Sequence, residues 1–401
     1  MGAVYEIGVL CALEEAIPAL DLNALDGYVG VSAGALVAAG LANGITPRQL
    51  FNAFIENDGP RVDIVRPSVF AQPALAEYLH RLAMLPGLMV QAAYGFALQG
   101  RSTLATLEHL ARALPTGMFS HAPLQAQLQR MLNEPGRSND FRQLKRRLVL
   151  VATDLDSGES APFGLPGWDH VPISEAAAAS AALPGMFPPV RIGERFYVDG
   201  ALKKTLHARV LLDMGLDLVL CLNPLVPFDG SGARRHRVLG GALTPIPHLV
   251  DGGLPVVLSQ TFRTLIHSRL ELGMQGYRHS HPDTDLLLFE PEHHDPELYS
   301  ANTFAYSGRR MLAEHAYQRT RADLRSRRGV LGQQLARHGL SLDDAVLDDV
   351  SRHLVRRRRQ RHHHPLPKGT AASRSLQRLD EVLDDLDRCL QAWPQEQIKR
   401  R

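Results

Sequence analysis

A five-residue segment near the N-terminus constrains the fold more than any other part of the sequence. Residues 30–34 read Gly-Val-Ser-Ala-Gly, and the alanine-rich run after them predicts a helix over residues 35–43. This is the sequence form of a nucleophile elbow, in which a strand turns sharply into a helix with a serine at the corner. Gly30 and Gly34 avoid collisions at such a turn, and Ser32 would project its hydroxyl from the sheet. The alternative is an ordinary glycine-rich turn that contains a serine.

A second segment offers the base that a serine nucleophile needs. Residues 196–201 read Phe-Tyr-Val-Asp-Gly-Ala, which predicts an aromatic and β-branched strand that ends in an acid and a glycine. Asp199 is therefore expected at a strand end, where residues of α/β proteins commonly carry chemistry. Gly200 lets the backbone turn at once, so that the carboxylate can face across the sheet. The alternative is an aspartate that only terminates its strand through an Asx-turn.

Together with the sequence between them, these segments resemble the patatin-like phospholipase family. The elbow at residues 30–34 matches the family's Gly-x-Ser-x-Gly motif, and residues 199–201 match its Asp-Gly-Ala motif. Residues 176–190 are similar to the family's Ala/Ser-rich helix and Pro-Gly-x-Phe-Pro-Pro turn, and residues 151–159 to the strand and turn before it. The matches occur in the family's order and cover about residues 1–225 directly.

The resemblance implies a lipid acyl hydrolase with a Ser-Asp dyad in place of a Ser-His-Asp triad. Ser32 would attack the carbonyl of a phospholipid or other lipid ester, and Asp199 would take its proton and later activate water. Gly200 and Ala201 would complete the Asp-Gly-Ala motif around this base. An aspartate pKa near 4 makes a weak base at neutral pH, so a partly desolvated pocket is expected to raise it. No metal or cofactor is expected.

His207 is the alternative base of a conventional triad. It lies eight residues beyond Asp199, near the start of a helix predicted over residues 208–214. Triad acids and histidines usually come from separate loops, so this spacing favours the dyad.

The chain departs from the family's pattern at its start. The resemblance implies an apolar strand and a glycine-rich loop whose amides form the oxyanion hole, but only Gly2 and the helix predicted after it, to about residue 16, correspond to that loop. Ala33, between Gly30 and Gly34, would be the remaining donor. Losing one donor costs about 100-fold to 1,000-fold in turnover. Three interpretations follow: a misplaced start, a catalytically impaired protein that binds lipid or a partner protein, or a hole formed by another loop.

Composition fits a globular α/β protein. The 401 residues carry 44 Lys and Arg against 42 Asp and Glu, so no global charge favours nucleic acid. Cys11, Cys221 and Cys389 have neither metal-ligand nor disulfide spacing, which suits a reducing compartment. No run reaches the roughly 18 apolar residues of a membrane span. The expected location is the cytoplasm, with peripheral membrane contact as a further expectation, and the oligomeric state stays open.

The succession of elements predicts an α/β fold, a three-layer α/β/α sandwich with a mostly parallel central sheet. Strands are expected over residues 148–153 and 216–222, on either side of the strand that ends at Asp199 in the sequence. A helix is expected over residues 258–275 and a last strand over 286–290. Residues 1–330 would form the hydrolase domain.

Two regions are expected to lie outside this core. Residues 45–145 lack the family's motifs and predict a helical cap, in which the apolar residues 82–98 are interpreted as a buried helix, with a lid or membrane-contacting surface as the alternative. Residues 229–247 predict an exposed loop. Residues 331–401 predict a basic linker and a C-terminal amphipathic helix, whose basic stretch at residues 356–364 would contact anionic lipids or form a solvated tail.

Overall fold

The computed structural model covers most of the chain. It describes residues 1–98, 111–203, 206–229, 236–238, 242–244, 248–295, 297–298 and 306–355. The basic stretch at residues 356–364, the amphipathic C-terminal helix and Cys389 lie outside the described residues.

The strand and helix predicted around the elbow are both present. β1 covers Gly27–Val31 and α2 covers Ala33–Ala42, with Ser32 at the corner between them. Gly30 permits this close approach, because a Cβ at Gly30 would lie 2.6 Å from the Cα of Ala35 in α2. The elbow is therefore formed by the residue types that the sequence placed there.

Five strands form the sheet that carries the elbow. Their order is β1-β2-β5-β4, and β3 lies off this path and pairs with residues 150–153 of β2. β2 (Arg147–Asp154) is parallel to β1 but antiparallel to β3 (Ser160–Phe163) and to β5 (Arg195–Asp199), and β4 (Val190–Ile192) is antiparallel to β5. The α/β class holds, but the sheet is mixed rather than mostly parallel. The physical reason is that short turns join β2 to β3 and β4 to β5, and such hairpins pair strands in opposite directions.

A separate strand pair lies later in the chain. β6 (Leu218–Leu222) and β9 (Asp285–Phe289) are parallel, and the long helix α9 (Gly253–Ser280) lies between them in the sequence, as a parallel crossover requires. The predicted three-layer arrangement stays a prediction. In the predicted loop at residues 229–247, the described residues form two short antiparallel strands, β7 (His236–Val238) and β8 (Ala242–Thr244).

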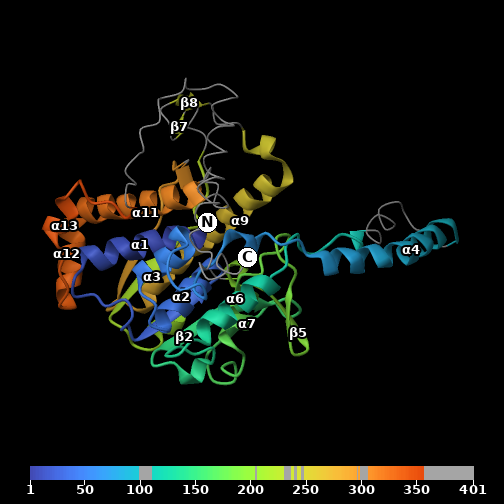
Figure 1. Ribbon diagram of the computed structural model, residues 1–401, viewed down its shortest axis with the longest axis horizontal. Coiled ribbons are helices and arrows are strands. Elements are labelled where there is room, and N and C mark those ends of the chain that lie inside the picture. The colour runs from blue at the N-terminus through green and yellow to red at the C-terminus, as the bar shows by residue number, and fades with distance from the viewer. Residues whose placement is uncertain are drawn as a thin grey trace, which may run out of the picture.

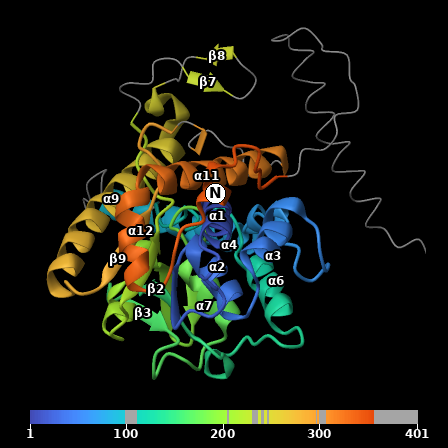
Figure 2. The same ribbon diagram turned by 90° about the vertical axis from the view of Figure 1, so that its left-hand side faces the viewer.

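Helices pack on the sheet and on one another to form the core. α2 and α7 (Ile173–Ser180) both contact β2 and each other, so they lie on the same face. α1 (Gly2–Ala16), which agrees with the helix predicted after Gly2, runs alongside α11 (Tyr306–Ser326), as Figures 1 and 2 show. Gly8 permits this packing, since a Cβ there would lie 2.6 Å from the carbonyl oxygen of Ala313.

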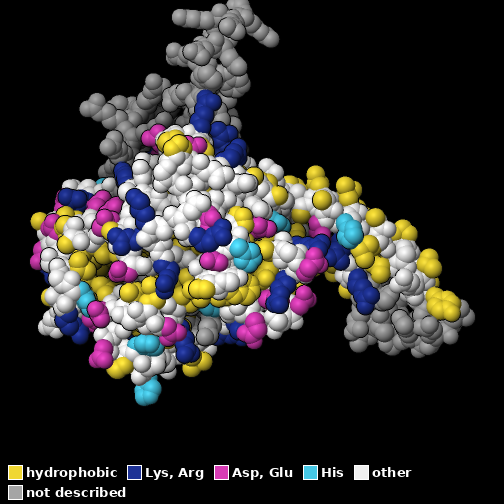
Figure 3. Space-filling model, turned by 90° about the horizontal axis from the view of Figure 1, so that it is seen from below, with side chains coloured by type: hydrophobic (Ala, Val, Ile, Leu, Met, Phe, Trp, Pro, Cys, Tyr) yellow, Lys and Arg dark blue, Asp and Glu magenta, His cyan; other side chains and the backbone are white. Residues whose placement is uncertain are grey.

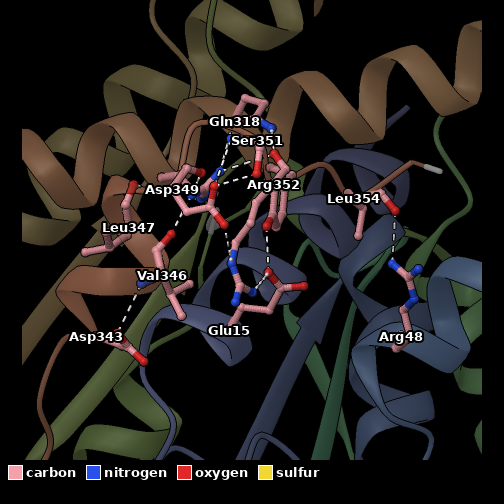
Figure 4. Close-up of polar contacts among 12 residues, drawn as sticks. Glu15, Arg48, Gln318, Asp343, Val346, Leu347, Asp349, Ser351, Arg352 and Leu354 are labelled. Carbon is pink, nitrogen blue, oxygen red and sulfur yellow. Dashed lines mark hydrogen bonds and ion pairs between the residues drawn. The ribbon is translucent and has the colours of Figure 1, made fainter. Parts of the chain in front are cut away.

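The last described residues fold back onto α1 and α11. After α12 (Arg328–Arg337) and α13 (Asp344–Asp348), residues 349–355 lie near α1, α3 (Pro47–Phe51) and α11, where Arg48 donates a hydrogen bond to the carbonyl of Leu354 at 3.1 Å (Figure 4). The buried guanidinium of Arg321 in α11 donates to the carbonyls of Val346, Leu347 and Asp349. The described chain beyond residue 330 is therefore packed against the same core.

Residues 45–145 are largely helical where they are described. α4 (Leu75–Leu98) extends away from the body, and α6 (Ala122–Leu132) packs against α7 (Figure 1). The interpretation of residues 82–98 as a buried helix is wrong for most side chains described there, which are exposed, while Leu88 and Ala92 are buried.

Within the described ranges, no helix meets the length and hydropathy needed to span a bilayer. The remaining short elements are η1 (Asn52–Glu56), η2 (Pro67–Phe70), η3 (Phe141–Gln143), η4 (Gly200–Leu202), α8 (Arg209–Leu212) and η5 (Leu249–Gly252).

Candidate active site

Ser32 occupies a strained backbone position between β1 and α2. Its φ is 56° and its ψ is −125°, in a region that residues with a side chain rarely adopt. Such strain persists only where the surrounding structure enforces it, and it is concentrated at functional sites. The corner holds the Ser32 side chain away from both elements that it joins.

The strand register brings Ser32 and Asp199 together from distant parts of the sequence. Val31, the last residue of β1, pairs with Val151 of β2, and the next residue of β2, Ala152, pairs with Asp199 of β5. The ends of β1 and β5 therefore meet along one edge of β2, opposite β3. The Ser32 hydroxyl donates a hydrogen bond to Asp199 Oδ2 at 2.5 Å.

Asp199 is held by the turn that follows it. Its Oδ1 accepts a hydrogen bond from the Ala201 amide at 2.9 Å, which orients the carboxylate. Gly200 is needed for this turn to lie against β2, because a Cβ at Gly200 would lie 2.1 Å from the carbonyl oxygen of Val151. The three residues of the predicted Asp-Gly-Ala motif thus each contribute to the same geometry.

Burial changes the acid-base properties of Asp199. The residue is 1% exposed, and this burial raises the pKa of its carboxyl to about 6, although hydrogen bonds from Ser32 and Ala201 oppose the rise. The carboxylate is then mostly ionised at neutral pH, and it is a stronger base than an ordinary aspartate. This agrees with the rise expected from the sequence.

Ser180 supports the elbow, and sequence reasoning gave it no role. Its hydroxyl accepts a hydrogen bond from the Ser32 amide at 2.9 Å and donates one to the carbonyl of Val151 at 2.7 Å. Ser180 is fully buried at the end of α7 and ties the nucleophile segment to the central strand. The signal in the sequence was a hydroxyl at the end of an alanine run that resembles the family's Ala/Ser-rich helix.

Two helix N-termini lie at the elbow. Ala33 and Gly34 open α2, and the first amides of a helix have no acceptor within it, so they can donate to an anion. α1 begins beside them, since a Cβ at Gly2 would lie 2.9 Å from the Ala33 Cβ. Because the Ser32 amide already donates to Ser180, Ala33 and Gly34 supply the elbow's available donors.

Glu6 of α1 is a buried carboxyl beside this N-terminus. A Cβ at Gly34 would lie 3.4 Å from Glu6 Oε1. Burial raises the pKa of Glu6 to about 8, so the side chain is mostly protonated at neutral pH. A neutral carboxyl there does not repel negative charge that develops near Ala33.

Comparison with known families identifies the chain. The model of the family described as patatin-like phospholipase matches residues 1–212, more than half of the sequence, and this stretch contains both Ser32 and Asp199. The chain belongs to the patatin-like phospholipase family. Members of this family typically hydrolyse lipid esters.

One solved structure can be set beside this family member, although the likeness is limited. The crystal structure of VipD from Legionella pneumophila is 17% identical, with a TM-score of 0.24. The match covers 50% of this chain and 44% of that chain, so the chain spans less than half the length of VipD.

The other residues considered from the sequence lie outside the Ser32–Asp199 contact of this patatin-like chain. His207 is buried at a φ of 48°, and the Ser32 hydroxyl reaches the Asp199 carboxylate directly without it. Cys11 and Cys221 are buried free thiols, and burial raises the pKa of both. In the part of the chain that the structure describes, no group of three or more His, Cys, Asp or Glu residues could hold a metal ion.

Proposed function

We propose that this chain is a serine lipid acyl hydrolase, of the phospholipase A or lipid esterase type, in which Ser32 and Asp199 act as a dyad through an acyl-enzyme. The observation that carries the proposal is the 2.5 Å hydrogen bond from the Ser32 hydroxyl to a buried carboxylate, made by a serine at a strained elbow. Membership of a family that hydrolyses lipid esters supports the substrate class.

In the first half-reaction, Asp199 accepts the hydroxyl proton as Ser32 Oγ attacks the ester carbonyl. The carbonyl oxygen becomes an oxyanion, which the amides of Ala33 and Gly34 stabilise together with the positive end of α2. The intermediate then collapses, the bond to the alcohol breaks, and the alcohol oxygen takes the proton from Asp199. The acyl group remains on Ser32 as an ester.

In the second half-reaction, water takes the place of the alcohol. Asp199 accepts a proton from water as the water oxygen attacks the acyl carbonyl, and the same amides stabilise the second oxyanion. Collapse releases the fatty acid and returns the proton to Ser32 Oγ. One carboxylate serves both steps, so no histidine is required.

We further propose the domain roles that the sequence predicts. Residues 1–330 act as the hydrolase domain, with residues 45–145 as its helical cap. Residues 331–401 supply a basic linker and an amphipathic helix, and the packing of α12 and α13 against the core supports an anchored start for this region. The proposed location is the cytoplasm, with peripheral contact to membranes.

The test is labelling with a fluorophosphonate probe, combined with hydrolysis of a short monomeric ester. We expect the full-length chain to be labelled, and Ser32→Ala and Asp199→Asn each to lose hydrolysis by roughly 1,000-fold or more. Ser280→Ala, an exposed serine at the end of α9, is the matched control and should keep both signals.

A different result in these two measurements would contradict the proposal. If the full-length chain is not labelled and Ser32→Ala hydrolyses the ester as well as the wild type does, the enzyme proposal fails. The catalytically impaired protein that binds lipid or a partner would then be the better description.

A further inference from the structure

α4 exposes a continuous apolar stripe. Leu75, Leu79, Leu82 and Met89 follow one another at spacings of four, three and seven residues, which places them on one face of the helix. Each of these side chains is more than half exposed, from 58% for Met89 to 67% for Leu79. Figure 3 shows hydrophobic side chains along the part of the molecule that extends from the body. A stripe of this length in water is unfavourable unless something covers it.

The distribution of charge along α4 identifies what covers the stripe. Residues 82–98 contain no Asp, Glu, Lys, Arg or His, whereas Glu77, His80 and Arg81 all lie in the first two turns. Arg81 pairs with Glu77 at 2.9 Å. A partner helix would cover one stripe and leave the other faces in water, where charged residues are normal. A helix without charge on any face suits the hydrocarbon of a bilayer.

The uncharged length fits one leaflet. Seventeen helical residues extend about 25 Å, which is shorter than the roughly 30 Å hydrocarbon core of a bilayer. An inclined helix of this length can enter one leaflet while the charged first turns stay at the headgroups.

The base of α4 is connected to the candidate active site. The Tyr78 hydroxyl of α4 donates a hydrogen bond to the Met118 carbonyl at 2.8 Å, and the amides of Met118 and Phe119 donate to the carbonyls of Gly185 and Met186 at 3.2 and 2.8 Å. A few residues before Gly185, the carbonyl of Ala182 accepts a hydrogen bond from the Asp199 amide at 3.0 Å. Met118 and Met186 also expose 43% and 38% of their surface. The apolar surface at the base of α4 therefore adjoins the turn that leads to the proposed catalytic base.

We propose that α4 is a membrane-inserting arm, which dips its uncharged residues into one leaflet and holds the site at the bilayer surface. The inference rests on the proposed function for its purpose, which is access to lipid esters. Insertion itself requires no catalysis, so the two proposals can fail separately.

The first test places an environment-sensitive NBD fluorophore on the arm. Cys389→Ser leaves the buried Cys11 and Cys221 as the natural thiols, and Met89→Cys then supplies the labelling site. With phosphatidylcholine vesicles we expect a blue shift and quenching by doxyl-labelled lipid. Val330→Cys on α12, whose parent side chain is 64% exposed, is the matched control and should give neither signal. No response at position 89 would overturn the proposal.

The second test measures vesicle binding by flotation. Leu82→Asp combined with Met89→Asp should lower partitioning by about 10-fold or more, because both positions lie in the uncharged part of α4 and aspartate is strongly disfavoured in hydrocarbon. Val330→Asp should bind as the wild type does. Circular dichroism and thermal melting check that each variant is folded.

Two further outcomes separate this proposal from others. Ser32→Ala should bind vesicles as the wild type does, so a failure of the proposed chemistry leaves the binding result intact. If light scattering instead finds a dimer that the Leu82→Asp and Met89→Asp variant abolishes, while vesicle binding is unchanged, the stripe is a contact with a second copy and the arm proposal is wrong.

Discussion

At the scale of single residues, the contact between Ser32 and Asp199 combines two local turns with a non-local pairing of strands. The glycines around Ser32 and the glycine after Asp199 indicate a sharp turn at each position, and such signals are local. The hydrogen bond between the two side chains depends on the register of three strands, which no local pattern encodes. The contact of Ser180 with the elbow was missed for the same reason.

The acid limb of the pH profile should report Asp199. Its carboxyl must be ionised to accept the proton of Ser32, and burial raises its pKa to about 6. We therefore expect kcat/KM to fall about 10-fold for each pH unit well below 6 and to level off above it. Hydrolysis of a monomeric ester across this range measures it, and a profile that is flat down to pH 5 would contradict the assignment of Asp199 as the base.

The same pKa predicts how stability changes with pH. Because the native pKa of Asp199 is about 6 and its usual value is 3.8, the native state binds the proton more tightly between these values. Stability contributed by this group is therefore lost as the pH rises from about 4 to about 6, by on the order of 3 kcal/mol. The Asn side chain in Asp199→Asn stays neutral. As the pH rises from about 4 to about 6, the free energy of unfolding of this variant, measured with urea, should therefore increase relative to that of the wild type. If the difference in the free energy of unfolding between Asp199→Asn and the wild type stays the same from about pH 4 to about pH 6, the raised pKa of Asp199 is contradicted.

At the scale of elements, helices were easier to predict than strand directions. The helix predicted after Gly2, to about residue 16 before Pro18, agrees with α1. The mixed sheet was missed because strand direction depends on connections. Gly158 and Gly193, which lie at positive φ in the β2–β3 and β4–β5 turns, were the signals for hairpins.

A substitution at Gly200 tests how closely the turn after Asp199 fits β2. In Gly200→Ala the new Cβ would meet the Val151 carbonyl oxygen at 2.1 Å, so the turn must move and the protein should lose about 1 to 3 kcal/mol or more of stability. Gly329→Ala in α12 is the matched control, because nothing lies within 4 Å of its added Cβ. Thermal melting compares the two, and equal melting temperatures would contradict the predicted clash.

At the scale of the whole molecule, the arrangement separates a folded body from an exposed apolar arm. Hydropathy indicated that residues 82–98 are apolar, but it could not indicate that they leave the body, because buried and lipid-facing helices have similar compositions. The exposure of most side chains described there depends on how α4 is anchored at its base, by contacts such as the hydrogen bond from the Tyr78 hydroxyl to the Met118 carbonyl.

Salt should have little effect on binding to neutral vesicles. The net charge is only +2, and insertion of the uncharged part of α4 depends on apolar transfer rather than on attraction between charges. Between about 0.05 and about 0.5 M salt we expect partitioning into phosphatidylcholine vesicles to change less than about 3-fold. A steep loss with salt would mean that charged contacts dominate the binding.

The left-handed backbone of Ser32 bears on the stability of the fold. A side chain at this φ destabilises the fold by on the order of 1 to 2 kcal/mol, a penalty that glycine avoids. We expect Ser32→Gly to melt no lower than Ser32→Ala, although both lack the hydroxyl. At this corner, serine is therefore less favourable for the fold than glycine, and the group that it adds is the hydroxyl that donates to Asp199.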